Sequence, residues 1–465
     1  MKISNLFIAF LVLVATTLFH SPTYASELSK NSGKEAQPPL YIDNVHIVDV
    51  NTGQVIENRQ LLILNGKIAA IKPAETPIAD KLYTRHDGKG SYVLPGLIDM
   101  HVHAYDPAAF MITLSHGVTH LRLMNGVKEH IIWRKELEEG SRVGSTITVS
   151  SPTISGFKNA HMHYSAQTPM DATTAVIKAK QQGYDLIKAY GNLTGPVLKA
   201  LLSEAKKQNI SVAKHGPHPA ADMEWNELSG LQSVEHVEDI YQGPLNHQYD
   251  QKKLDETIVK LKALDTPITP TLNIYWQLTQ ISEQKQAYID RLPKDYISPI
   301  IALEEKHHQV KRWINSSEAM VSHNKKTFAF LQEITRQLYQ AKIPLLIGTD
   351  SGELLSPHGL ATHTEMALMQ QAGLPTIEVL RAATMNAAKA LDKEFQFGQV
   401  AVGYDADLIL SEQNPIEHLA TLEQPAAVVK HGRLFSNIEL QQLRRKAIEE
   451  RSFWQEIKTL SKAGG

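Results

Sequence analysis

The chain alternates short apolar runs with longer stretches in which apolar positions recur at helical spacing. In the central region the apolar runs begin near Val93, Val118, Thr146, Asp185, Ser211, Ser233, Pro267 and Ile343. This alternation is typical of repeated β/α units, in which helices cover a sheet of parallel strands. Strands of this kind within residues 93–395 predict an α/β fold whose main domain is a (β/α)8 TIM barrel.

Two β-rich blocks lie on either side of this region. Residues 40–92 contain YIDNVHIVDV and RQLLILNGKIAAI, divided by Thr-Gly and Asn-Gly pairs that are typical of hairpin turns. Residues 396–437 contain ADLILSE and AAVVKHGRLF. Neither block is large enough to form a well-covered sandwich alone. Because the two ends of a barrel lie near each other, we expect one small composite β-sandwich domain built from both blocks.

The N-terminal segment has the pattern of a secretory signal peptide. Lys2 precedes an apolar stretch over residues 6–19, and Thr23-Tyr24-Ala25 offers a small-residue cleavage site. The apolar stretch is shorter than the ~20 residues that a membrane span needs. We therefore predict that residues 1–25 are removed on export to the periplasm or the medium and that no membrane anchor remains. Residues 26–39 are expected to form a polar linker.

Two further segments are helical by their spacing. Residues 277–340 are rich in Lys, Glu, His and Gln and are longer than one barrel helix requires. They either cover the mouth of a site or form an exposed helical pair without a catalytic role, and the sequence favours neither. Residues 438–465 predict a charged, amphipathic C-terminal helix that packs on the outside.

The composition is that of a globular protein without strong electrostatic character. Of 465 residues, 42% are hydrophobic and 21% are charged, and the formal net charge is −2. Removal of Lys2 with the signal peptide would leave 46 basic against 49 acidic residues, a charge near −3. This balance gives no basis for binding nucleic acid. The chain has no cysteine, so any metal site would consist of nitrogen and oxygen ligands.

The most specific chemical motif is PGLIDMHVH, in which His101 and His103 flank Val102 at the end of an apolar run. Side chains alternate along a strand, so both imidazoles point to the same side. Two imidazoles at the carboxyl end of a buried parallel strand are well placed to hold a divalent metal. The alternative is a pair of solvated or core histidines, a reading that suits a single histidine better than this pair.

Four other candidate residues each end a predicted strand. They are Lys188 in DLIKAY, His215 in SVAKH, His236 in SVEH and Asp350 in IPLLIGTD. Each is a weak signal alone, and Asp350 could simply cap the helix that follows. Together with the histidine pair, they predict one site at the C-terminal face of the barrel.

This order of HxH, Lys, His, His and Asp resembles the binuclear branch of the amidohydrolase superfamily, and FGQVAVGYDADLIL resembles the return into the family's β-domain. The prolidase-like and imidazolonepropionase-like branches are the most similar. The resemblance implies two divalent metal ions, one held by His101 and His103 and the other by His215 and His236. It also implies that Lys188 is carboxylated and bridges them, with an ordinary lysine at a mononuclear site as the alternative. Zinc is the default metal because it suits these ligands, and manganese or iron would also fit.

The remaining roles also follow from the resemblance. Asp350 would bind one metal, act as the general base and carry the proton to the leaving amine. His161 and His163, after the third strand, and Tyr190, two residues beyond Lys188, are expected to contact the substrate. The alternatives are a second metal site for the two histidines and packing at the barrel rim for Tyr190.

The sequence therefore predicts an exported metal-dependent hydrolase that cleaves an amide or peptide-like bond of a small molecule or short peptide. A dipeptidase or carboxypeptidase is the leading interpretation. A lactonase, a phosphotriesterase or a cyclic-amidine hydrolase would use the same site. A catalytically silent metal-binding protein would have lost a ligand or the aspartate, and the sequence retains them all. Assembly into a homo-oligomer is left open.

Overall fold

The computed structural model describes residues 38–77, 83–160, 162–307 and 309–461. The predicted signal peptide and nearly all of the predicted linker lie outside the described residues. Among the described helices, none combines the length and the apolar character that a bilayer span requires.

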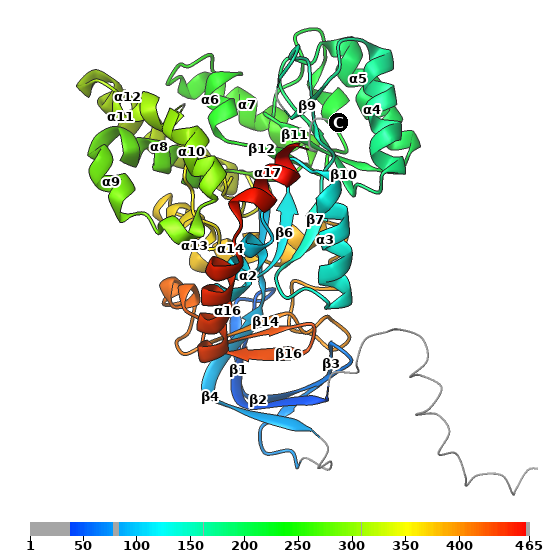
Figure 1. Ribbon diagram of the computed structural model, residues 1–465, viewed down its shortest axis with the longest axis vertical. Helices are drawn as coiled ribbons and strands as arrows, with labels where there is room; N and C mark the ends of the chain where they lie inside the picture. The colour runs from blue at the N-terminus through cyan, green and yellow to red at the C-terminus, as the bar shows by residue number, and fades with distance from the viewer. Residues whose placement is uncertain (1–37, 78–82, 161, 308, 462–465) are drawn as a thin grey trace, which may run out of the picture. The chain divides into compact units, whose positions relative to one another are not determined.

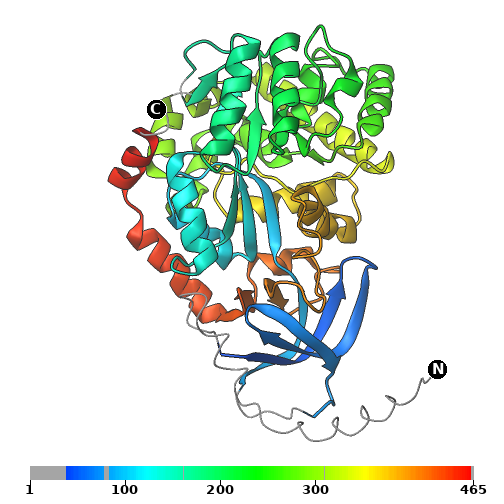
Figure 2. The same cartoon turned by 90° about the vertical axis from the view of Figure 1, so that its right-hand side faces the viewer.

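Strands from both ends of the chain pair in one seven-stranded sheet, in the order β16-β15-β14-β4-β1-β2-β3 (Figure 2). The strands are β1 (Leu40–Asp49), β2 (Gln54–Leu64), β3 (Lys67–Pro73), β4 (Thr84–Pro95), β14 (Leu408–Ser411), β15 (Ala427–Lys430) and β16 (Arg433–Ser436). β14 joins the two halves by pairing antiparallel with β4. Ile42, Ile47 and Leu408 belong to the buried apolar core of this sheet. Both β-rich blocks of the sequence therefore contribute to one paired structure.

The remaining strands are parallel and alternate with helices (Figure 1). One sheet contains β5 (Leu97–Val102), β6 (Val118–Leu123) and β7 (Thr146–Val149). The other, in the order β13-β12-β11-β10-β8-β9, contains β8 (Thr153–Ser155), β9 (His163–Ser165), β10 (Leu186–Ala189), β11 (Ser211–His215), β12 (Ser233–Glu235) and β13 (Ile268–Thr269). Isolated parallel bridges link the two sheets at Ser150–Leu186 and link each of them to residues 345–351. Continuous strand pairing does not close a barrel among the described residues.

Helices cover these sheets. The outer helices are α2 (Ala108–Ser115), α3 (Lys128–Glu139), α4 (Pro169–Gln181), α5 (Gly195–Lys207), α6 (Glu238–Gln242), α7 (Gln251–Leu264), α13 (Leu360–Gln371), α14 (Thr376–Ala382) and α15 (Met385–Ala390). α2 is buried along its whole length, whereas α4 packs through one apolar face. In α4 the buried positions are Ala172, Ala175, Val176 and Ala179, the spacing of one helical face. Thr168 begins this helix by accepting a hydrogen bond from the backbone of Asp171.

The first parallel strand begins later than the sequence predicted. Val93 and Leu94 belong to β4, where they pair with β14, and β5 starts at Leu97. Gly96 lies between the two strands, and a Cβ at this position would lie 2.2 Å from Thr119 Oγ1, so the close approach of β6 requires glycine here. His163, predicted to follow the third strand, begins the short strand β9, which pairs with β8.

The predicted eighth strand, residues 343–350, is not a regular strand. Backbone hydrogen bonds of 2.8 Å nevertheless join this segment to β5: Met100 N donates to Ile347 O, and Asp350 N donates to His101 O. The extended pattern ends at Asp350, whose φ is 56°. The segment therefore lies beside β5, as an eighth strand would, without its regular conformation.

The two segments predicted to be helical are more divided than expected. Residues 277–340 hold most of α8 (Leu272–Gln284) followed by α9 (Gln286–Arg291), α10 (Pro299–His307), α11 (Gln309–Ile314) and α12 (Glu318–Gln340), so the helical pair is wrong. We call α8–α12 the helical insertion. The C-terminal helix is also two helices, α16 (Asn437–Glu450) and α17 (Phe453–Ser461) (Figure 1). Between them the backbone is extended at Arg451, which donates hydrogen bonds to Asp106 and to the carbonyl of Ile297.

Candidate active site

A cavity of about 460 Å³ lies at the carboxyl ends of the parallel strands. This volume is typical of small-ligand sites. All six residues predicted to hold metal line it: His101, His103, Lys188, His215, His236 and Asp350. The helical insertion supplies part of the opposite wall, because Leu278, Gln309, Arg312 and Trp313 also line the cavity. Its residues therefore take part in the site.

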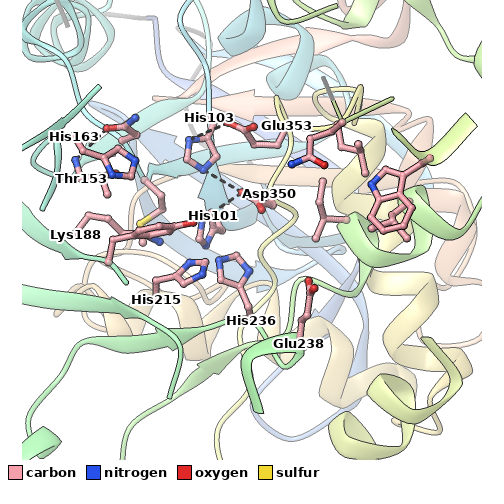
Figure 3. Close-up of a pocket in the computed structure, with 18 of the residues that line it drawn as sticks. His101, His103, Thr153, His163, Lys188, His215, His236, Glu238, Asp350 and Glu353 are labelled. Atoms are coloured by element: carbon pink, nitrogen blue, oxygen red, sulfur yellow. Dashed lines mark hydrogen bonds and ion pairs between the residues drawn. The ribbon is translucent and has the colours of Figure 1, made fainter. Parts of the chain in front are cut away.

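His101, His103 and Asp350 converge in the cavity (Figure 3). Asp350 Oδ1 lies 3.0 Å from His103 Nε2 and 3.4 Å from His101 Nε2. One ligand atom from each residue lies within 4.8 Å of the others. The two imidazoles lie on one side of the chain, as strand alternation predicted. Burial opposes ionisation of Asp350, yet the neighbouring imidazoles hold the pKa of its carboxyl well below the ordinary value.

The hydrogen bonds of two histidines fix which ring nitrogen is free. His101 Nδ1 donates to Glu235 Oε2 at 2.8 Å, so the lone pair of His101 is on Nε2, facing Asp350. His236 Nδ1 lies 2.7 Å from the hydroxyl of Thr271, which itself donates to Pro270 O. His236 Nδ1 is therefore the donor in this contact, and its Nε2 is the free nitrogen. Burial lowers the pKa of both histidines, which favours the neutral form that binds metals.

His215, His236 and Lys188 lie on the other side of His101 (Figure 3). The ring centroid of His236 is 4.4 Å from that of His215 and 4.7 Å from that of His101. Lys188 is 2% exposed, and within the described part of the chain its Nζ has no hydrogen-bond partner. Burial lowers the pKa of Lys188 to about 8, although Glu235 and Asp350 act in the opposite direction.

This donor set fits divalent cations. Neutral imidazole nitrogens and a carboxylate are suitable ligands for them. An unpaired buried ammonium is costly, so the isolated Nζ of Lys188 favours the neutral amine, the form that can become a carbamate. His215 Nδ1, which is also buried, lacks a hydrogen-bond partner among the described residues. The geometry is therefore compatible with the predicted ligands, whose roles remain predictions.

Distant contacts hold Asp350 in place. Asp99, which is buried in β5, accepts hydrogen bonds from the backbone and hydroxyl of Thr349 and from the hydroxyl of Thr362. A Cβ at Gly348 would lie 2.2 Å from Thr269, so this position requires glycine. These contacts support Asp350 in the left-handed region, a conformation that often occurs at functional sites.

A profile of the amidohydrolase family matches residues 92–435. The chain belongs to the amidohydrolase family. Members of this family generally bind divalent metal ions, and His101, His103 and Asp350 form the candidate site in this amidohydrolase.

Individual relatives differ in their activities. A 5-methylthioadenosine/S-adenosylhomocysteine deaminase of Syntrophobacter fumaroxidans is 25% identical over 424 residues, 82% of this chain and 89% of that protein. An imidazolonepropionase of Vibrio cholerae is 37% identical over 117 residues, 23% of this chain and 27% of that protein. A Xaa-Pro dipeptidase crystallised with methionine has a TM-score of 0.64 at 21% identity, covering 86% of this chain and 100% of that one. At that identity, the structural likeness concerns the fold alone.

The shorter matches carry little information about activity. This chain is 42% identical to an adenine deaminase of Desulforamulus reducens over 79 residues. That match covers 17% of this chain and only 13% of the deaminase.

The residues predicted to contact substrate are placed as follows. Tyr190 and His163 line the cavity, and the Tyr190 ring centroid lies 4.1 Å from that of His215 and 5.2 Å from that of His163. His163 Nδ1 lies 3.0 Å from the hydroxyl of Ser155. His161 lies outside the described residues. The positions of His163 and Tyr190 are compatible with substrate contact, which stays a prediction.

Sequence reasoning missed a buried chain of polar contacts behind His101. Arg122 Nη2 donates to Glu235 Oε1 at 2.7 Å, and the other oxygen of Glu235 accepts from His101. Arg122 also donates to Met100 O and to the hydroxyl of Ser233. Arg122 and Glu235 are fully buried. A charged residue inside the apolar run VTHLRL was the available signal, but its partner lies 113 residues away.

Replacing Arg122 with methionine should destabilise the amidohydrolase strongly. The substitution would leave Glu235 buried without its cation, and breaking such pairs typically lowers the free energy of unfolding by about 3–5 kcal/mol. Lys325→Met, which breaks an exposed ion pair with Glu283, should cost no more than about 1 kcal/mol. Urea unfolding of both variants after removal of divalent ions measures the difference. Equal, small losses would contradict a structural role for the Arg122–Glu235 pair.

Proposed function

We propose that this amidohydrolase is an exported, binuclear metal-dependent hydrolase that cleaves an amide or peptide-like bond of a small substrate, as a dipeptidase or carboxypeptidase does. The observation that carries the proposal is the gathering of all six predicted ligand residues around one cavity of about 460 Å³. Two divalent ions, zinc by default, would be held by His101 and His103 and by His215 and His236. When bound, they would supply an activated water and polarise the substrate carbonyl.

Asp350 is the residue best placed to move the proton. Its Oδ1 lies within 3.4 Å of the Nε2 atoms of both His101 and His103, at the centre of the candidate ligand group. The lowered pKa keeps this carboxyl ionised, and a carboxylate at this position could accept a proton from the attacking water. The same oxygen would then deliver that proton to the leaving amine.

Lys188 has the surroundings that carboxylation requires. Its amine is buried, forms no ion pair among the described residues, and has a pKa lowered to about 8 by burial. A larger fraction of free amine is therefore available to react with carbon dioxide than for an exposed lysine. The carbamate would supply the anionic bridge between the two cations.

The experiment is a hydrolysis panel on metal-loaded protein. We expect release of an amino acid from dipeptides or N-acyl amino acids. The panel also contains a lactone, a phosphotriester, a cyclic amidine and an aminopurine nucleoside, because the last tests deamination, the activity of one relative. Turnover of one of these other classes, with the peptides untouched, would overturn the peptide-bond assignment while leaving a metal hydrolase.

For the fold, we propose that the parallel strands form a (β/α)8 barrel and that residues 40–92 and 396–437 form a composite β-sandwich domain. The isolated bridges Ser150–Leu186, Ile268–Leu345 and Val102–Ser351 support the barrel, because they link the end of β7 to β10 and link residues 345–351 to β13 and to β5. Pairing of β14 with β4 supports a domain drawn from both chain ends.

Export is a separate proposal, supported by the basic, apolar and small-residue order of residues 1–25. N-terminal sequencing of protein from its native host should give Ser26-Glu27-Leu28. Recovery of chains that still begin at Met1 would contradict cleavage.

A further inference from the structure

One side of the cavity is apolar and comes largely from the helical insertion. Ile274 and Leu278, one turn apart on α8, line the cavity together with Trp313 of α11 and Leu354. These four side chains belong to a single hydrophobic cluster. Ile274, Leu278 and Trp313 are only partly buried, so they retain apolar surface that a ligand could cover. We call these four residues the apolar wall.

Arg312 lies next to this wall and lines the same cavity. Its guanidinium carbon is 4.7 Å from the ring centroid of Trp313, a distance that permits a cation–π contact. The side chain is exposed, and within the described ranges it forms no ion pair with an acid. Arg122 and Arg451, by contrast, each contact a carboxylate. Arg312 therefore has its hydrogen-bond donors available to a ligand.

The charges around the cavity limit what this ligand can be. Lys188, the proposed site of carboxylation, is buried at the end of β10, whereas Arg312 is on the insertion. Asp350, Glu238 and Glu353 also line the cavity, and among the lining residues of the insertion Arg312 is the cationic one, so it is the group there that can attract an anion. A carboxylate matches the planar guanidinium, which can donate two parallel hydrogen bonds to it.

We propose that Arg312 and the apolar wall form a subsite for a substrate in which a free carboxylate lies beside an apolar group. The C-terminal residue of a dipeptide or an N-acyl amino acid with an apolar side chain has this arrangement. The carboxylate accepts hydrogen bonds from Arg312, while the side chain covers Trp313 and Leu278. This inference rests on the proposed peptide-bond hydrolysis and specifies which end of the substrate the helical insertion recognises.

The test compares free acids with amides. Alanyl dipeptides ending in Leu, Phe, Met or Pro are assayed beside their C-terminal amides, with wild type and Arg312→Gln. We expect KM for the acids to rise about 10- to 100-fold in the variant, with kcat nearly unchanged. KM for the amides should change by less than about threefold. Because the guanidinium is exposed, added salt should weaken the preference of wild type for the acids.

Lys311→Gln is the matched control. Lys311 precedes Arg312 on α11, is also exposed and does not line the cavity. Replacing it with glutamine changes the net charge by the same amount as Arg312→Gln. Lys311→Gln should leave KM unchanged for both the acids and the amides. A similar rise in KM for the acids in both variants would show that the effect is general electrostatics, and it would overturn the subsite.

Trp313→Ser tests the wall separately. It should reduce the preference for Leu over Ser at the C-terminal position. An unchanged preference would remove the wall from the proposal.

The outcomes separate the inference from the function on which it rests. Hydrolysis of acids and amides with equal efficiency by wild type, unchanged in Arg312→Gln, overturns the subsite and leaves peptide-bond hydrolysis standing. If metal-loaded wild type hydrolyses neither the acids nor the amides, the proposed function is overturned, and the subsite with it.

Discussion

Asp350→Asn should lower kcat/KM by about 10²–10⁴-fold while the protein stays folded and keeps most of its metal. Asparagine preserves the size of the side chain, and its oxygen can still face His101 and His103. It cannot accept the proton of the attacking water, and as a neutral ligand it binds a cation less strongly. The loss should therefore appear mainly in kcat. Steady-state kinetics, circular dichroism and metal analysis of the same preparations measure the three properties together.

Asp392→Asn is the control for this variant. Asp392 also has a left-handed φ, 56°, but it is exposed and lies outside the cavity. The same chemical change in the same backbone conformation should leave the kinetics unaffected. Near wild-type turnover in Asp350→Asn would remove this aspartate from the mechanism.

Lys188→Ala should lose bound metal and activity together, because it removes the predicted bridge between the two cations. Formate or acetate added in solution should restore part of the activity, since a small carboxylate can occupy the vacated position. The measurement is metal per chain and turnover with increasing carboxylate. This pattern differs from that of Asp350→Asn, in which metal is retained and turnover is lost.

Lys430→Met separates this effect from the general cost of changing a buried lysine. Lys430 is 4% exposed and pairs with Asp407 in the seven-stranded sheet, away from the cavity. Its replacement should lower stability without lowering metal content. Full metal occupancy with normal turnover in Lys188→Ala would end the carbamate hypothesis.

The sequence pattern could predict those parts of the site that depend on the backbone geometry of a single strand. His101 and His103 lie on one side because alternation along a strand is fixed by the backbone. The predicted positions of His215 and His236 rested on apolar runs with clear ends, and the structure brings their rings within 4.4 Å.

The parts that local pattern could not predict depend on contacts distant in sequence. The segment before Asp350 reads as a strand, but its contacts with Asp99 and Thr269, which are distant in sequence, go with an irregular conformation that the pattern does not predict. Glu235 was passed over beside His236, because its role appears only when Arg122 and His101 are placed around it. The helical insertion gave a clear helical pattern, yet neither its division into α8–α12 nor its place beside the cavity is encoded in that spacing.

The most direct test of the central proposal is a metal titration of the wild-type protein. Divalent ions are first removed with a chelator, and zinc is then added while bound metal per chain is measured. The proposal predicts saturation at two equivalents, with one site formed by His101 and His103 and the other by His215 and His236. Saturation at one equivalent would contradict the binuclear site.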